Sequence, residues 1–360
     1  MNNKVIFTIS SKNYFGQGLT LLDSVYALYN NEIDYYYLIV DKDLNGIKEY
    51  NPSFHLILVE EIGIPDFNDL TFKYDVVEFN TAVKPFFMDY MLKKYQKIIY
   101  LDPDIFLYKR IDNIFEILDN YSIVLTPHIV DTDFRVSQIE PSEYSFLQVG
   151  VFNLGFIAIS NDQEAIKFVK WFETRNRYAC FVNRKGLFVD QKWINYVPCL
   201  FNNYYVLRDK EYNVAYWNIS ERAFTEEETK NIVFFHFSTA DPKNDQIITK
   251  IDSHIYNLKN FPAYTKMVKD YCHLLNHNRF YEYRKMGYTY NRFNNGRPIN
   301  KYHRIAYEDG NDKTSNPFES KPTSPLYIKG SMINNLKKLS KKINIISKIK
   351  YRFFTSYINH

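Results

Sequence analysis

The sequence predicts an α/β protein with a doubly wound, mostly parallel mixed sheet flanked by helices, followed by a C-terminal helical extension. Two observations support this fold class. Short apolar runs alternate with segments of helical periodicity in the first half of the chain, and strands separated by helices favour a parallel sheet with helices on its faces. In addition, Asp102 and Asp104 directly follow a predicted strand, and ligands collect beyond the carboxyl ends of such strands.

The first half of the chain carries the clearest pattern. Strands are predicted for short runs rich in branched and aromatic residues, namely residues 5–9, 35–40, 54–59 and 98–101. Helices are predicted at residues 19–29 and 81–94. In the second of these helices, apolar side chains recur near the helical spacing of 3.6 residues and Pro85 fits the first turn.

The second half continues the alternation less regularly. The elements expected after the apolar run 121–125 are a loop at 131–145, strands at 151–159, 204–207 and 232–237, and helices at 164–174, 190–197 and 263–275. Gly155 is expected to break the strand in which it lies. The predicted domains are a catalytic domain at residues 1–260, an aromatic-rich helical extension at 261–310, a polar linker at 311–325 and a tail at 326–360.

The composition excludes several classes of protein. Hydrophobic residues make up 46% of the 360 residues and charged residues 24%, which excludes disorder along the whole chain. The three cysteines have no paired spacing, so neither a disulfide framework nor a structural zinc site is expected. The N-terminal apolar run is too short for a signal peptide, and no run reaches the roughly 18 residues of a membrane span. We therefore predict a cytoplasmic protein that does not span a membrane.

The basic residues are concentrated in the tail. Residues 320–360 hold nine of the 45 basic residues and no acidic residue. The rest of the chain, residues 1–319, therefore has 36 basic and 41 acidic residues, and this net negative charge does not favour nucleic-acid binding. Apolar residues recur in the tail at three- and four-residue steps, namely Met332, Leu336, Leu339, Ile343, Ile346, Ile349 and Phe353. A basic amphipathic helix of this kind predicts peripheral binding to an anionic membrane at its inner face. The alternative is a terminal helix that packs this stripe on the main domain.

Asp102 and Asp104 are the strongest candidates for chemistry. Their spacing places both carboxylates on one side of an extended chain that leaves the strand 98–101. Two such carboxylates repel each other unless a cation joins them, and their oxygens suit Mg²⁺ or Mn²⁺. Two further Asp-x-Asp pairs, at residues 41–43 and 131–133, lack apolar flanks on both sides. The alternative for the first pair is two solvated carboxylates in a turn.

Four blocks of sequence follow one another in a fixed order. They are Lys84-Pro85-Phe86-Phe87 leading to Tyr100-Leu101-Asp102-Pro103-Asp104, then Phe152-Asn153-Leu154-Gly155-Phe156-Ile157, then Phe188-Val189-Asp190-Gln191, and finally Phe235-His236-Phe237-Ser238. Together these blocks resemble the family 8 glycosyltransferases and their bacterial relatives. The resemblance implies a GT-A fold, a Rossmann-like α/β domain that binds a nucleotide-sugar and a divalent cation.

The resemblance also implies a metal site and a reacting centre. Asp102, Asp104 and His236 would ligate the cation, and this mixture of imidazole and carboxylates favours Mn²⁺ over Mg²⁺. Asp190 would orient the donor sugar, with Gln191 near the reacting carbon. The alternatives are a core histidine for His236 and a helix cap for Asp190.

The remaining implied roles concern donor binding. Asn153 would hydrogen-bond the sugar, and Lys84 would contact the sugar or a phosphate; the alternatives are a satisfied strand-end Asn and a solvated Lys. Lys243, with Lys250 as the fallback, would contact the diphosphate.

The function that the resemblance implies is transfer of a hexose-type sugar from a nucleotide-sugar, with UDP favoured, to a hydroxyl group. The acceptor would be a glycan or a lipid-linked glycan in cell-surface polysaccharide synthesis, and the reaction would retain the anomeric configuration. Two alternatives from other classes stay open. In a phosphatase of the Asp-x-Asp type, Asp102 would be the nucleophile and Asp104 the acid. A non-catalytic carbohydrate- or membrane-binding module would keep the fold without the chemistry.

Overall fold

The structure is a computed structural model that describes residues 3–132, 141–184, 186–222, 225–310, 316–319, 328–336 and 339–340. The chain forms two compact units. One consists of Met1–Ile64 and Val76–Tyr288, and the other of Pro65–Asp75 and Thr289–His360. The tail stripe from Ile343 onward lies outside the described residues.

A seven-stranded mixed sheet with the order β10-β6-β7-β4-β1-β2-β3 forms the centre of the first unit. Its strands are β1 (Lys4–Ser10), β2 (Asp34–Ile39), β3 (Phe54–Leu58), β4 (Lys97–Leu101), β6 (Ile123–Pro127), β7 (Phe152–Ser160) and β10 (Tyr204–Val206). β1 pairs in parallel with β2 and β4, as do β2 with β3 and β10 with β6, whereas β7 is antiparallel to both neighbours. The predicted α/β class with a mostly parallel mixed sheet is confirmed.

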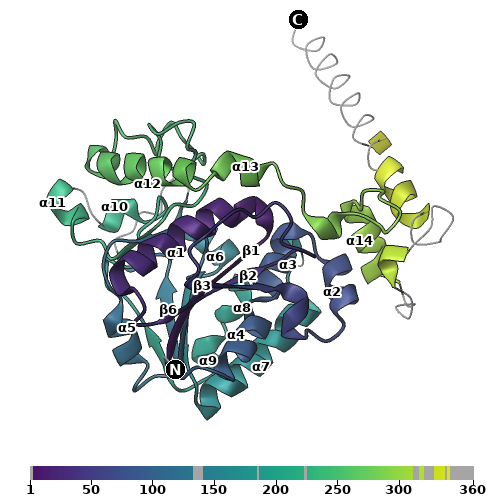
Figure 1. The fold of residues 1–360 in the computed structure, drawn as a ribbon, viewed down its shortest axis with the longest axis horizontal. Helices are drawn as coiled ribbons and strands as arrows, with labels where there is room; N and C mark the ends of the chain where they lie inside the picture. Colours follow the sequence, from purple (N-terminus) through teal and green to yellow (C-terminus); the bar gives the residue numbers. More distant parts are fainter. Residues whose placement is uncertain are drawn as a thin grey trace, which may run out of the picture. The chain divides into compact units, whose positions relative to one another are not determined.

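Helices cover both faces of this sheet (Figure 1). Ile6 of β1 lies in one core cluster with residues of α1 (Phe15–Tyr29), whereas the ring of the next residue, Phe7, lies 5.1 Å from that of Phe87 in α4 (Lys84–Leu92). Because side chains alternate along a strand, α1 and α4 cover opposite faces. The other helices of this unit are α3 (Val76–Ala82), α5 (Asp112–Ile117), α6 (Glu143–Val149), α7 (Gln163–Tyr178), α8 (Gln191–Ile194), α9 (Val197–Leu200), α10 (Ile219–Arg222), α11 (Glu226–Thr229), α12 (Thr265–His277) and α13 (Phe280–Arg284).

The sheet reverses its strand order at β1. The chain continues from β1 to β2 on one side, while β4 lies on the other, so the carboxyl ends of β1 and β4 are neighbours at a topological switch point. Two short antiparallel pairs lie outside the main sheet: β5 (Ile105–Leu107) with β11 (Phe234–His236), and β8 (Val182–Arg184) with β9 (Leu187–Phe188). Because β5 directly follows β4 in the chain, the pair that β5 forms with β11 lies next to this switch point.

Several predicted elements differ in the structure. The helix predicted at 81–94 is α4, which begins at Lys84; a separate helix, α3, precedes it and ends at Ala82, since Pro85 has no N–H with which to continue α3. The prediction that Gly155 breaks its strand is wrong, since β7 runs through it and the irregularity is a register shift against β6. The loop predicted at 131–145 already contains the start of α6, and the helix predicted at 190–197 is divided into α8 and α9.

The second unit packs aromatic side chains around a buried arginine. Its helices are α2 (Phe67–Lys73) and α14 (Lys301–Glu308), and residues 328–336 are also helical. The guanidinium of Arg304 donates to the carbonyl oxygens of Phe72 and Tyr290, at 2.6 and 3.2 Å, and to Asn291 Oδ1 at 2.8 Å. Part of the aromatic, Arg- and Asn-rich stretch of the extension thus forms a packed core. In the described ranges, no helix is both long and apolar enough to cross a membrane.

Gly16→Ala should lower the free energy of unfolding by about 2 kcal/mol through overpacking. An added Cβ at Gly16 would lie 2.6 Å from the backbone oxygen of Asn278, so the turn after α12 has to move. In the control Gly287→Ala, no described heavy atom lies within 4 Å of the added Cβ, and we expect a change below about 0.5 kcal/mol. Urea unfolding measures both. Equal stability of the two variants would contradict a close contact between α1 and this turn.

Candidate functional site

Of the residues that the sequence predicted for chemistry, all except Lys243 and its fallback Lys250 line one pocket of about 620 Å³ in the first unit. It lies at the carboxyl end of β4 and is also lined by residues of β7, β9 and β11. The polar side chains that line it are Thr81, Lys84, Asp102, Asp104, His128, Ser145, Asn153, Asp190, Gln191, Tyr216, Trp217, His236, Ser238 and Thr239. The carboxyl edge of the sheet is where an α/β fold places its ligands.

Backbone pairing brings His236 to the two aspartates. The register of β5 and β11 sets His236 opposite Ile105, and the N–H of Phe237 donates to the carbonyl oxygen of Asp104 at 2.8 Å. His236 Nε2 consequently lies 3.0 Å from Asp104 Oδ1 and 3.8 Å from Asp102 Oδ2. The candidate ligand atoms of the three residues all lie within 4.8 Å of one another.

Gly155 provides the space that the imidazole occupies. A Cβ added at this position would lie 2.5 Å from His236 Cε1 and 2.7 Å from its Nδ1, which real side chains do not tolerate. The ring also contacts Trp217, with centroids 5.1 Å apart in an edge-to-face arrangement. His236 is therefore held with Nε2 toward the carboxylates.

The electrostatics of this cluster fit a divalent cation. Burial alone would lower the pKa of His236, but the carboxylates of Asp104 and Asp102 raise it above its ordinary value. Burial raises the pKa of Asp102, against the opposing charges of Lys84 and His236. Two carboxylates and an imidazole in a half-buried position form the oxygen and nitrogen donor set that Mn²⁺ or Mg²⁺ accepts.

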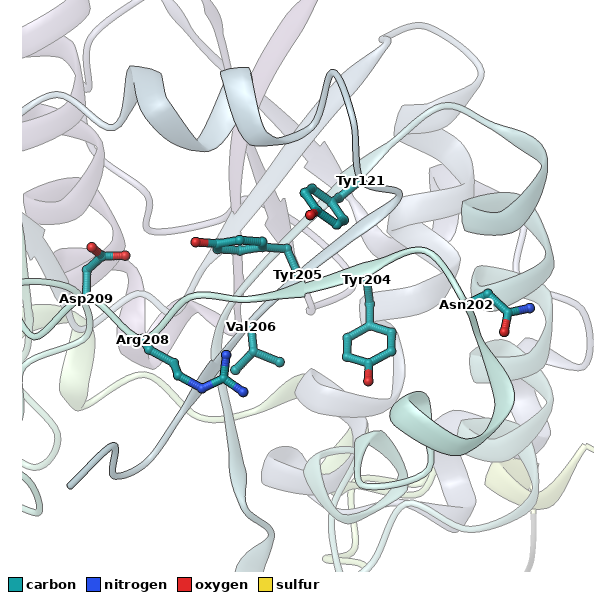
Figure 2. Close-up of a pocket in the computed structure, with 7 residues that line it drawn as sticks. All are labelled: Tyr121, Asn202, Tyr204, Tyr205, Val206, Arg208 and Asp209. Atoms are coloured by element: carbon teal, nitrogen blue, oxygen red, sulfur yellow. The ribbon is translucent and has the colours of Figure 1, made fainter. Parts of the chain in front are cut away.

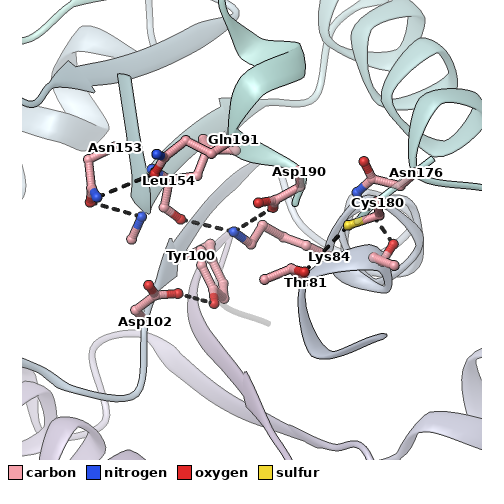
Figure 3. A network of polar contacts seen from close by, with 12 residues as sticks. Thr81, Lys84, Tyr100, Asp102, Asn153, Leu154, Asn176, Cys180, Asp190 and Gln191 are labelled. Atoms are coloured by element: carbon pink, nitrogen blue, oxygen red, sulfur yellow. Dashed lines mark hydrogen bonds and ion pairs between the residues drawn. The ribbon is translucent and has the colours of Figure 1, made fainter. Parts of the chain in front are cut away.

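A buried ion pair lies beside this cluster (Figure 3). Lys84 Nζ lies 2.8 Å from Asp190 Oδ2, and both side chains are 2% exposed. The same ammonium donates to the carbonyl oxygen of Leu154 at 2.9 Å and lies 4.4 Å from the ring centroid of Tyr100. Burial raises the pKa of Asp190, and Lys84 opposes this shift. Although Asp190 immediately precedes α8, its side chain makes no capping hydrogen bond within the part of the chain that the structure describes.

Gln191 and Asn153 belong to one network of protein hydrogen bonds. Gln191 Oε1 accepts from the N–H of Leu154 at 3.1 Å, and its Nε2 donates to the carbonyl oxygen of Val149 at 3.1 Å. Asn153 Oδ1 accepts from the N–H of Gly155 at 3.0 Å, and its Nδ2 lies 3.4 Å from Gln191 Oε1. Both side chains line the pocket, and the network fixes their orientation.

Lys243 and Lys250 are not among the described residues that line this pocket. Lys250 Nζ pairs with Asp241 at 3.2 Å, and Lys243 Nζ lies 5.2 Å from the ring centroid of Tyr281. The segment between His236 and Lys243 contributes Ser238 and Thr239 to the pocket instead.

Backbone strain occurs at two positions of the pocket wall. Val189 and Thr239 have φ values of 43° and 58°, in the left-handed region that β-branched residues avoid. Val189 directly precedes Asp190, and Thr239 follows the strand that carries His236. Strain of this kind persists where the surrounding structure fixes the backbone, and it clusters at functional sites.

Sequence reasoning missed His128 and Trp217. His128 directly follows β6, lies 5.0 Å from the ring of Phe146, and is buried in the pocket wall. Trp217 has a buried Nε1 with no hydrogen-bond partner among the described residues. A polar residue directly after a strand, as at Asp102, was a signal for His128; Trp217 lies in an aromatic stretch where no pattern distinguishes it.

A second hollow of about 710 Å³ lies along the edge strand β10 (Figure 2). Tyr121, Tyr204, Tyr205, Arg208 and Asp209 line it. Among its described lining residues, none belongs to the set predicted for chemistry, so the candidate site is the pocket at the carboxyl end of β4.

Comparisons with known proteins give distant similarities. No family model matches the chain. The chain is 25% identical over 248 residues to the uncharacterized protein YfnF of Bacillus subtilis (strain 168), which covers 64% of this chain and 80% of YfnF. It is 24% identical over 247 residues to the uncharacterized protein YfnD of the same organism, covering 64% of this chain and 76% of YfnD.

The solved structures that this chain resembles include glycosyltransferases. The glycosyltransferase GlyE of Streptococcus pneumoniae TIGR4 is 14% identical with a TM-score of 0.45, over 81% of this chain and 67% of GlyE. The galactosyltransferase LgtC, solved with donor and acceptor sugar analogues, is 13% identical with a TM-score of 0.43, over 73% of this chain and 95% of LgtC.

Acid should destabilise the protein through His128. Burial lowers its pKa to about 3, whereas an exposed histidine has a pKa of about 6.5, so the unfolded chain takes up this proton first. The contribution of neutral His128 to the free energy of unfolding is complete above about pH 6.5. It is lost as the pH falls toward 3, by up to about 1.4 kcal/mol per pH unit. His128→Phe keeps an aromatic ring and should show a smaller loss in urea unfolding between about pH 7 and pH 5. Parallel pH curves for the variant and the wild type would contradict this expectation.

Proposed function

We propose that this chain is a metal-dependent glycosyltransferase with a GT-A type domain. It would transfer a hexose-type sugar from a nucleotide-sugar, with UDP favoured, to a hydroxyl group of a glycan acceptor. The observation that carries the proposal is the convergence of Asp102, Asp104 and His236, with ligand atoms within 4.8 Å, beside the buried pair of Lys84 and Asp190. The predicted catalytic domain of residues 1–260 contains all of these groups.

In the proposed mechanism, Asp102, Asp104 and His236 would hold Mn²⁺ or Mg²⁺. When bound, the cation stabilises the negative charge that develops on the departing nucleoside diphosphate. Asp190, held by Lys84, accepts hydrogen bonds from the donor sugar. Asn153 would hydrogen-bond the sugar and Gln191 would lie near the reacting carbon, and a network of protein hydrogen bonds already orients both side chains.

The Lys84–Asp190 pair supports a retaining, front-face route. Asp190 Oδ2 is engaged by Lys84 at 2.8 Å and is poorly placed to act as a nucleophile. In the front-face route, the bond from the anomeric carbon to the phosphate oxygen breaks and the acceptor oxygen bonds to the same face. The proton of the acceptor hydroxyl passes to the leaving phosphate. The contact of Lys243, or Lys250, with the diphosphate stays a prediction.

The two alternative functions are less favoured. A phosphatase nucleophile needs a free carboxylate oxygen, whereas Asp102 Oδ1 accepts a hydrogen bond from the Tyr100 hydroxyl and Oδ2 faces His236. A non-catalytic module has no need for an imidazole placed against two carboxylates.

The tail supports a membrane-associated acceptor. Ile328, Met332 and Leu336 are spaced four residues apart in the helical residues 328–336 and are 45%, 58% and 62% exposed. The lysines around this stripe and the lack of acidic residues from residue 320 onward suit an anionic surface. We propose that the enzyme binds peripherally to the inner membrane face and extends a lipid-linked glycan in polysaccharide synthesis.

Asp102→Asn and Asp104→Asn should each lower metal-dependent donor hydrolysis by at least about 100-fold, because the cation loses a charged ligand. Hydrolysis of UDP-, GDP- and CMP-sugars with Mn²⁺ is the measurement, and UDP-sugars should respond. Asp119→Asn, which changes a carboxylate that is 64% exposed and pairs with Lys97, is the control and should keep wild-type activity. Near wild-type hydrolysis by Asp102→Asn at saturating Mn²⁺ would refute the metal site.

The double variant Met332→Glu, Leu336→Glu should reduce sedimentation with phosphatidylglycerol vesicles several-fold, because it places charge on the apolar face of a membrane-binding helix. Leu200→Glu, which changes another exposed leucine, is the control. Donor hydrolysis should be unchanged in both. The membrane proposal fails if the double variant sediments as the wild type does.

A further inference from the structure

Tyr100 lies between the two parts of the candidate site. It is in β4, two residues before Asp102, and is 3% exposed. Its hydroxyl donates a hydrogen bond to Asp102 Oδ1, and its ring lies beneath the ammonium of Lys84, 4.4 Å from ring centroid to Nζ (Figure 3). A second ring, that of Phe7 in β1, packs against it at 5.5 Å. The tyrosine therefore has a fixed position and contacts both charged groups.

We propose that Tyr100 is a positioning residue that orients the metal-ligating carboxylate of Asp102 and couples it to the Lys84–Asp190 pair. The inference rests on the proposed metal site. The resemblance that identifies the two aspartates assigns no role to the tyrosine before them.

The contacts of Asp102 give the physical reason. A carboxylate on a single rotatable bond can present either oxygen to a ligand. The Tyr100 hydroxyl occupies Oδ1, so Oδ2 faces the pocket, 3.8 Å from His236 Nε2. Removal of a hydrogen bond that holds a ligating carboxylate in this way typically lowers metal affinity on the order of 10–100-fold.

The coupling to the ion pair goes through the ring. A cation over an aromatic face attracts its electron density, and linked polar groups polarise one another, which makes the hydroxyl a stronger donor. Lys84 is placed by Asp190 at 2.8 Å and by the carbonyl oxygen of Leu154 at 2.9 Å. A change at the Lys84–Asp190 pair is thus transmitted to Asp102 through the side chain of Tyr100.

The experiment measures the affinity of the full chain for Mn²⁺ alone. Calorimetry gives the affinity directly, and electron paramagnetic resonance gives the concentration of the free ion. Tyr100→Phe keeps the ring under Lys84 and removes the hydroxyl, so we expect Mn²⁺ affinity to fall about tenfold. Tyr95→Phe is the matched control: that hydroxyl also donates to a carboxylate, Asp34 Oδ2 at 2.7 Å, at the opposite end of the sheet. Its Mn²⁺ affinity should equal that of the wild type.

A second readout separates positioning from a loss of structure. In Tyr100→Phe, the Mn²⁺ concentration for half-maximal donor hydrolysis should rise about tenfold, while turnover at saturating Mn²⁺ changes little and the unfolding curve stays cooperative. Wild-type Mn²⁺ affinity in Tyr100→Phe overturns the role of Tyr100. If Asp102→Asn also binds Mn²⁺ as the wild type does, the metal site itself is refuted, so the two failures are distinguishable.

Discussion

The ammonium group of Lys84 compensates the negative charge of a largely buried pocket. Asp190 and Asp102 come from separate parts of the chain, and burial raises the pKa of each. Lys84 opposes both shifts and so favours the ionised form of each carboxyl group. Removal of one partner from such a pair typically costs about 3–5 kcal/mol, because the other charge is left buried. The start of α4 thus controls whether the pocket can exist.

The sequence allowed the sheet and the first half of the site to be predicted. The strand predicted at 98–101 is within one residue of β4, and Asp102 and Asp104 follow it because the apolar run and its polar end are adjacent in the chain. Only the family resemblance allowed His236 to be predicted beside them, because it is the pairing of β5 with β11 that brings His236 close to the two aspartates. Periodicity gives no information on contacts between segments so far apart.

Other features of the structure could not be predicted from the sequence, for different physical reasons. The network of Asn153, Gln191 and Leu154 depends on polar groups inside the protein, where hydropathy predicts apolar side chains. From the sequence, Arg304 would be expected on the surface. In the structure its guanidinium is buried and binds backbone oxygens of α2, which precedes it by some 230 residues. The helix α2 itself was missed because its stability comes from that second unit and not from local propensity.

Gly155 has a consequence for how this sequence can vary. The imidazole of His236 fills the volume that any larger residue at position 155 would need. The two positions are thus mutually restrictive although they lie far apart in the chain. A relative that carries a side chain at the position of Gly155 must also have moved or replaced the histidine. A glycine at this position therefore indicates that a chain has kept the space that this imidazole occupies.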